Sequence, residues 1–108
     1  ELVRAGAAAA GRPPPKLFAY VRLALGAAAG DRLLKEGARY AAIPGYADHF
    51  ARMGVKPEET AIAARSPDAI APALGAWQGV VDEVVLRAVT EQDTVEETVA
   101  VVRAAKPA

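Results

Sequence analysis

Two runs of mostly apolar residues constrain the fold of this 108-residue chain more than any other feature. The first is KLFAYVRLALG, residues 16–26, and the second is VVLRAV, residues 84–89. Apart from one arginine in each, both runs are apolar on both faces of an extended chain, which is typical of strands in a parallel sheet covered on both sides. The first run is flanked by proline and glycine and is rich in aromatic and branched residues, so it predicts a strand rather than a buried helix.

Helical patterns fill the chain between these runs. Residues 27–43 predict a helix with one buried stripe, which consists of Leu33, Leu34, Gly37, Tyr40 and Ala41. The charged residues expected largely on the opposite side are Arg32, Lys35, Glu36 and Arg39. A second, short helix is predicted from Pro44 to Gly54, because proline favours the first turn of a helix and glycine favours its end. Residues 55–65 predict at most a turn of helix, from Pro57 onward.

Capping signals indicate two further helices. Ser66 and Pro67 predict the start of one helix, which Pro72 should kink or shorten. After the second strand, Asp93 is expected to cap a last helix, with Glu96 completing the spacing of a capping box. The expected buried stripe of this last helix consists of Val95, Val99 and Val102.

Alternating strands and helices predict an α/β fold with a parallel sheet and right-handed crossovers. We expect a single partial domain, 1–108, in three segments. They are a helix tail and Pro-rich lead-in (1–15), a strand with inserted helices (16–65), and a helix, a last strand and a C-terminal helix (66–108). About two parallel strands do not make a stable sheet, because both edges stay open.

Composition narrows the classes of partner. The chain has 13 basic and 13 acidic residues, so nothing in its charge favours nucleic acid or an anionic membrane. Disulfides and thiolate chemistry are excluded because there is no cysteine. No apolar run reaches the ~18 residues that a spanning helix needs. We therefore expect a cytoplasmic protein that binds neither nucleic acid nor membrane.

Four stretches taken together resemble one known family. They are PPPKLFAYVRLALG, IPGYADHFARMG, SPDAIAPALGAWQGVVDEVVLRAV and TEQDTVEETVAVVRAA. Their order and spacing are similar to the C-terminal part of the luciferase-like monooxygenase family, whose members are flavin- or coenzyme F-420-dependent oxidoreductases. The resemblance implies a C-terminal fragment of a TIM-type (β/α)8 barrel, in which residues 16–25 and 83–88 are the seventh and eighth strands. Roughly six strands of such a ~250-residue barrel would be absent.

The resemblance also implies a cofactor and a kind of substrate. The implied cofactor is coenzyme F-420, with FMN as the alternative, and parts of the barrel outside this chain would make most of the contacts to it. The implied substrate is a small molecule. A fragment of this kind would not be active alone, and it would associate with the missing barrel part or with further copies of itself.

Arg87 is the first candidate for a site. In a strand, Glu83, Val85, Arg87 and Val89 share one face, which in a barrel would be the interior, and Arg87 lies near the carboxyl end where barrel active sites form. It would bind a substrate carboxylate or a cofactor phosphate there, or it would form a structural ion pair. Arg22 is expected on the same side, in an ion pair with Glu83.

The helix from Pro44 carries the second candidate. Tyr46, His49 and Phe50 lie at helical spacing. In the family this region is an inserted segment above the barrel mouth, so the three residues would line a substrate pocket. The alternative is ordinary packing, with His49 as a surface or half-buried residue, because no triad or metal-ligand spacing accompanies it.

Two hypotheses about function follow. In the first, the chain is the C-terminal portion of a luciferase-like oxidoreductase that uses coenzyme F-420 or FMN for hydride transfer or oxygen activation. In the second, it is a small non-catalytic α/β module that associates with itself and covers its open strand edges with another copy.

Overall fold

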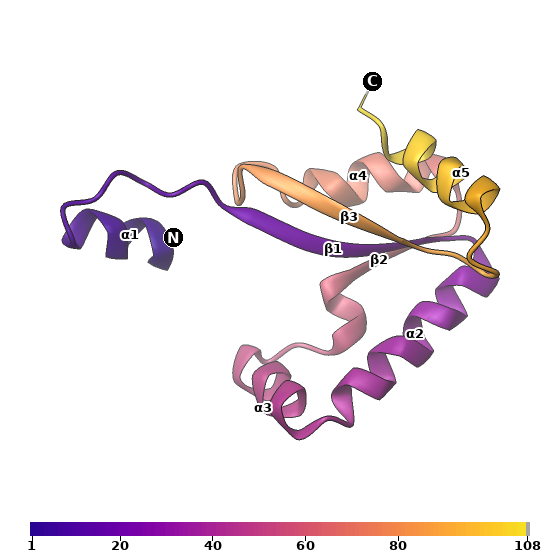
Figure 1. The fold of residues 1–108 in the computed structure, drawn as a ribbon, viewed down its shortest axis with the longest axis horizontal. Helices are drawn as coiled ribbons and strands as arrows, with labels where there is room; N and C mark the ends of the chain where they lie inside the picture. Colours follow the sequence, from indigo (N-terminus) through magenta and orange to yellow (C-terminus); the bar gives the residue numbers. More distant parts are fainter. Residues whose placement is uncertain (108) are drawn as a thin grey trace.

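A computed structural model describes residues 1–107 as a three-stranded parallel sheet flanked by helices. The strands are β1 (Phe18–Leu25), β2 (Ala61–Ala64) and β3 (Glu83–Val89), in the spatial order β2-β1-β3 (Figure 1). Both strand pairs are parallel. The α/β class is confirmed, whereas the expectation of about two strands is wrong because β2 supplies a third.

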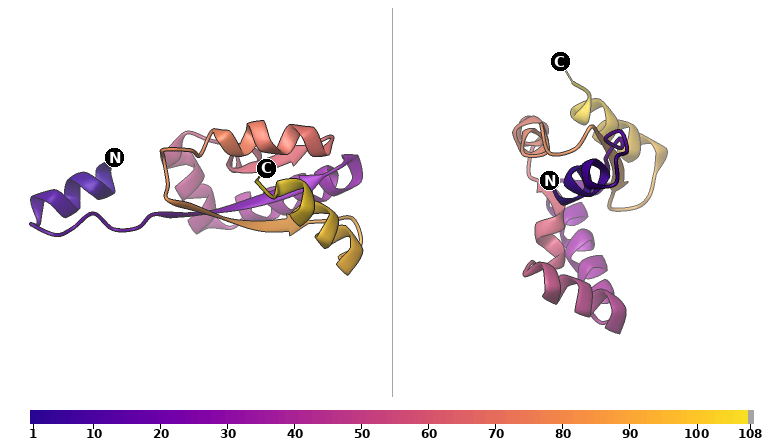
Figure 2. Two further views of the ribbon diagram at one scale, coloured as in Figure 1. Left: turned by 90° about the horizontal axis from the view of Figure 1, so that it is seen from above. Right: turned by 90° about the vertical axis from the view of Figure 1, so that its left-hand side faces the viewer.

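Helices cover both faces of the sheet. The helices of the described chain are α1 (Leu2–Ala9), α2 (Ala27–Ala41), α3 (Pro44–Met53), α4 (Ile70–Gly75) and α5 (Val95–Ala105). α2 lies on one face, and α4 and α5 lie on the other (Figures 1 and 2). The crossovers from β1 to β2 and from β2 to β3 run in opposite directions across the sheet. Right-handed connections therefore place α2 and α4 on opposite faces.

β2 is a short strand built almost entirely of alanine. It follows a single turn of 3-10 helix, Pro57–Thr60, and pairs with the carboxyl half of β1, from Arg22 to Leu25. This turn packs closely on α2: a Cβ added at Gly37 would lie 3.1 Å from the Cβ of Pro57. Glycine in α2 therefore allows the chain to approach closely enough to enter the sheet.

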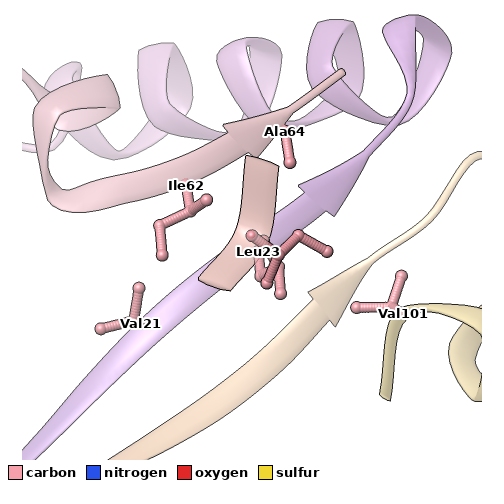
Figure 3. Packing of buried hydrophobic residues seen from close by; sticks show 6 residues of the cluster. Val21, Leu23, Ile62, Ala64 and Val101 are labelled. Carbon is pink, nitrogen blue, oxygen red and sulfur yellow. The ribbon is translucent and has the colours of Figure 1, made fainter. Parts of the chain in front are cut away.

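The main core lies between the sheet and the α4–α5 layer. Its buried residues are Val21, Leu23, Ile62, Ala64, Ile70 and Val101 (Figure 3). A second, smaller cluster under α2 consists of Ala24, Ala29, Leu33 and Val89. The largest completely buried side chains are those of Leu23, Ile70 and Val21. Both clusters are therefore small, and many large apolar side chains of the chain remain exposed.

The start of α5 differs from the prediction by one residue. Thr94 is the N-cap: its hydroxyl accepts a hydrogen bond from the backbone N–H of Glu97, and the Glu97 carboxylate accepts one from the backbone N–H of Thr94. Asp93 has φ of 58°, whereas an N-cap residue adopts an extended conformation. Asp93 and Glu96 are therefore not the capping pair.

The buried stripe of α5 was also predicted wrongly. Val95, Val99 and Val102 are 72%, 38% and 61% exposed, and Val101 is the buried valine. In α2, Ala29, Leu33 and Gly37 are buried as a stripe, but Leu34 is 50% exposed. In each helix several apolar residues compete for the core side, so periodicity alone does not fix which of them is buried.

The helix signals around α3 and α4 were read correctly in outline. α3 begins at Pro44 and ends before Gly54, which adopts φ of 67°. A 3-10 turn, Pro67–Ala69, leads into α4, which is only six residues long, as Pro72 led us to expect. The Ser66 side chain does not cap it.

α1 stands apart from the rest of the chain. It contains no buried residue, and an extended Pro-rich segment leads from it to β1 (Figures 1 and 2). Its link to the body is the ion pair between Arg4 and Asp82, with 3.4 Å between the charged atoms. The radius of gyration is 15.8 Å, larger than the about 13 Å typical of a 100-residue domain, as expected with α1 projecting from the body.

Candidate functional site

Two arginines lie side by side on the sheet face that α2 covers. Arg22 of β1 and Arg87 of β3 are Cα partners in the parallel register, so their side chains leave the same face. Glu83 is instead the Cα partner of Phe18 and forms an ion pair with Lys16 at 2.8 Å. The predicted ion pair between Arg22 and Glu83 is therefore wrong, because the register places Arg87 beside Arg22.

The carboxylate of Glu36, on α2, lies between the two guanidinium groups. Arg87 binds it in a bidentate manner, with nitrogen–oxygen distances of 2.7 and 3.2 Å. Arg22 donates a hydrogen bond to the same carboxylate at 3.3 Å and another to the carbonyl of Pro57 at 3.4 Å. The Glu36 and Arg22 side chains are only 18% and 10% exposed, whereas that of Arg87 is 43% exposed. We call Arg22, Glu36 and Arg87 the arginine cluster.

The arginine cluster keeps Glu36 ionised. Burial by itself raises the pKa of Glu36, but the hydrogen bonds and charges of Arg87 and Arg22 outweigh burial and leave the pKa below its ordinary value. The hydrogen bond to Glu36 raises the pKa of Arg87 in turn. The cluster holds two positive charges and one negative charge, so Arg87, its most exposed member, retains the capacity to meet an anion.

The aromatic candidates are only partly joined to this cluster. The Arg22 guanidinium lies over the ring of Tyr40 at 5.6 Å, and the rings of Tyr40 and Tyr46 are 5.1 Å apart. Tyr46 is thus linked to the arginines through Tyr40. His49 is exposed, and its ring lies 6.4 Å from that of the half-buried Phe50. α3 lies at the far end of α2 from the carboxyl ends of the strands (Figure 1).

A crevice opens at the carboxyl ends of β1 and β3. Its volume is about 250 Å³, and its lining includes Gly26, Ala28, Thr90, Glu91 and Glu97. Open α/β sheets bind ligands at this position, outside the carboxyl ends of the strands where the strand order reverses. The lining combines small side chains with two carboxylates, which favours a ligand without strong negative charge.

A further ion pair lies beside the crevice. The Arg32 guanidinium donates to the Thr90 carbonyl at 2.8 Å and also binds the Asp93 carboxylate. The hydrogen bond and charge of Arg32 lower the pKa of Asp93, despite the opposing effect of burial. Arg32 thus ties α2 to the loop that follows β3, so this side of the crevice is held by charge as well as by packing.

The sequence predicts Arg87 either as a ligand contact or in an ion pair, but it does not indicate the partner found in the structure. Glu36 was placed on the solvent side of α2, whereas it is half-buried against the sheet. The sequence does contain one indication of this partner. Strand periodicity places both arginines on one side of the sheet, and because buried charges are paired, a carboxylate is expected on the element that covers them. The register that makes Arg22 and Arg87 neighbours was not available from sequence.

Other kinds of site find no support in the described part of the chain. No group of three or more His, Asp or Glu side chains in residues 1–107 could hold a metal ion. None of the helices described has the length and apolar character that crossing a membrane requires. No family model, curated protein or solved structure matches the chain.

Proposed function

We propose that the chain is the C-terminal portion of a luciferase-like oxidoreductase, which uses coenzyme F-420 or FMN to transfer hydride or activate oxygen on a small-molecule substrate. The likeness of four sequence stretches to that family supports the proposal. The structural observation that carries it is an uncovered apolar sheet face. Phe18, Tyr20 and Val85 leave the sheet on the side of α2 and are 56%, 62% and 46% exposed. Such a face is expected where further protein completes the fold.

The crevice at the carboxyl ends of the strands does not fit the proposed cofactor by itself. Its volume of about 250 Å³ is smaller than the ~300–1,000 Å³ of pockets that enclose drug-sized ligands. We therefore assign the cofactor contacts mainly to the missing part of the protein and propose that this chain is inactive alone. Arg87 remains the candidate for contact with a substrate carboxylate or a cofactor phosphate, because its guanidinium is the most exposed of the arginine cluster.

The proposal includes a rearrangement of the sheet. In a (β/α)8 barrel each strand lies beside the next along the chain, and all the helices form an outer ring. Here β1 lies between β2 and β3, and helices cover both faces. In the complete protein β1 and β3, the seventh and eighth strands, would stay neighbours, and a strand of the missing part would take the place of β2 beside β1. α2 would leave the face that carries the arginine cluster. Arg87 would then be free to meet a ligand.

The test compares a longer protein that contains this sequence with the present chain. After incubation with coenzyme F-420 or FMN and removal of free cofactor, the longer protein should retain visible absorbance and the chain alone should not. Arg87→Ala in the longer protein should weaken cofactor or substrate binding without lowering its melting temperature. Binding of neither cofactor by the longer protein would overturn the proposal.

The second candidate function is a non-catalytic module that associates with itself. It is favoured by the same uncovered face and by the two open edges of the sheet, which another copy could cover. Unlike the first candidate, it needs no residues beyond those of this chain.

A further inference from the structure

The outer edge of β3 is a free strand edge. β3 pairs with β1 on one side, and in residues 1–107 no strand pairs with its other side. Its seven residues include no proline or lysine, and its register with β1 runs without interruption. Proline, bulges and charged side chains, lysine above all, commonly prevent one strand edge from pairing with another chain. β3 has no proline or bulge and carries two charges, Glu83 and Arg87, so it can accept a strand that pairs these charges with opposite ones.

We propose that β3 pairs antiparallel with β3 of a second copy, about a twofold axis at Val85. Val85 then faces Val85 of the second copy, and Glu83 faces Arg87 in both directions. On the other face of the sheet, Val84 meets Leu86. Cross-strand pairs of this kind, apolar with apolar and acid with base, stabilise antiparallel strands. The register forms the same contacts twice, as a twofold interface requires.

Charge complementarity selects this register over its neighbours. Centring the axis one residue later, on Leu86, would place Arg87 against Val85. Centring it one residue earlier, on Val84, would place Glu83 against Val85. Only the Val85 register pairs both charges with opposite charges. The bond from Arg87 to Glu36 does not prevent this, because a guanidinium has five N–H donors and the Arg87 side chain is 43% exposed.

A groove beside β3 supports the same partner. On the side of α5 it has a volume of about 400 Å³, and its lining is mostly apolar, with two basic residues at α5: Leu86, Ala88, Val101, Val102, Ala105, Arg103 and Lys106. Val102 is 61% exposed. A twofold axis perpendicular to the sheet keeps the α5 helices of both copies on one face. The second copy therefore adds a strand to the edge and places its own α5, with the exposed Val102, on the same face of the joined sheet.

The opposite edge of the sheet is a poorer site. β2 has four residues, and Ala63 is its exposed side chain. It offers little side-chain contact to a second strand.

The inference about β3 does not rest on the proposed oxidoreductase function. It concerns this chain alone, whereas in the longer protein a strand of the missing part would occupy the same edge. A result that contradicts the β3 dimer therefore does not contradict the oxidoreductase proposal, and the reverse also holds.

Single cysteines test the register, because the chain contains no cysteine of its own. Opposed residues in antiparallel strands have Cα atoms about 4.5–5.5 Å apart, within the range that a disulfide bridges. Val85→Cys should form a disulfide-linked dimer under mild oxidation. Glu83→Cys is the matched control on the same face: its two copies lie four residues apart along the pair, about 14 Å, and should stay unlinked. Equal linkage of both variants, or none of Val85→Cys, would overturn the proposal.

Sedimentation tests the charge pairs. The unmodified chain should sediment as a dimer at micromolar concentration. Glu83→Arg turns two attractive pairs into two repulsive ones and should raise the dissociation constant about tenfold. Lys16→Ala is the control, because it removes the partner of Glu83 within the same copy and should leave association unchanged. A monomeric chain, or association that Glu83→Arg leaves unchanged, would contradict the β3 interface.

Discussion

Arg22 and Arg87 are neighbours across the parallel pair of β1 and β3 and share one carboxylate, that of Glu36. Two guanidinium groups at adjacent strand positions would repel each other without an anion between them. Glu36 comes from α2, so the need to neutralise the strand charges also helps to fix this helix on the sheet. The ion pairs supplement a small apolar cluster between α2 and the strands.

Glu36→Gln should therefore lower the free energy of unfolding by about 2 kcal/mol or more. It removes the negative charge from a half-buried position and leaves two arginines without their partner. Urea denaturation followed by circular dichroism measures the effect. Glu58→Gln is the control, since Glu58 is exposed, and it should change stability by no more than about 0.5 kcal/mol. Equal effects of the two substitutions would show that the arginine cluster does not stabilise the fold.

Acid should destabilise the chain through the same carboxylate. The pKa of folded Glu36 lies below its ordinary value of 4.5, so its contribution to stability is present above pH 4.5. That contribution is lost as the pH falls through 4.5 and then through the lower folded pKa. Urea midpoints measured from about pH 6 to about pH 3 should fall, and they should fall less steeply in Glu36→Gln. Identical pH profiles would mean that Glu36 is not preferentially ionised in the folded chain.

A double-mutant cycle separates the structural role of Arg87 from a binding role. In this chain, Arg87→Ala should destabilise the wild type by about 1 kcal/mol more than it destabilises the Glu36→Gln variant, because the two side chains are in direct contact. Urea denaturation of the four proteins gives the coupling energy. A coupling energy near zero would mean that the bidentate contact adds no stability, and it would favour Arg87 as a residue kept for a ligand.

Thr94→Ala should cost about 1 kcal/mol of stability, because the hydroxyl caps α5. Thr94→Ser keeps the hydroxyl and should be nearly neutral. Asp93→Asn tolerates the positive φ and loses only an exposed charge pair with Arg32, so it should change stability by less than about 0.5 kcal/mol. Thermal melts of the three variants rank them, and a Thr94→Ala variant as stable as Thr94→Ser would show that the Thr94 hydroxyl does not cap α5.

The strongest patterns in the sequence predicted the strongest elements of the fold. β1 and β3 lie where two apolar faces indicated strands, and the parallel α/β arrangement follows from their alternation with helices. β2 was missed because its sequence, AIAA, lacks the aromatic and most of the branched residues that indicate strands. Pairing with β1, rather than local preference, makes it a strand.

The candidate site was less predictable because its geometry depends on register. Strand periodicity placed Arg22 and Arg87 on a common side, but only the observed pairing makes them neighbours instead of Arg22 and Glu83. The side of α2 that meets the sheet depends on which apolar residues the strands leave room for. Glu36 therefore faces the arginines, and Leu34 faces solvent.

The detachment of α1 makes this helix an independent unit of local unfolding. It has eight residues, and isolated helices shorter than about 12–15 residues are marginal in water. Its one ion pair joins two exposed side chains, a kind of contact that contributes little. Amide hydrogens of α1 should therefore exchange with solvent far faster than those of β1, and this helix should unfold and refold many times while the sheet stays intact.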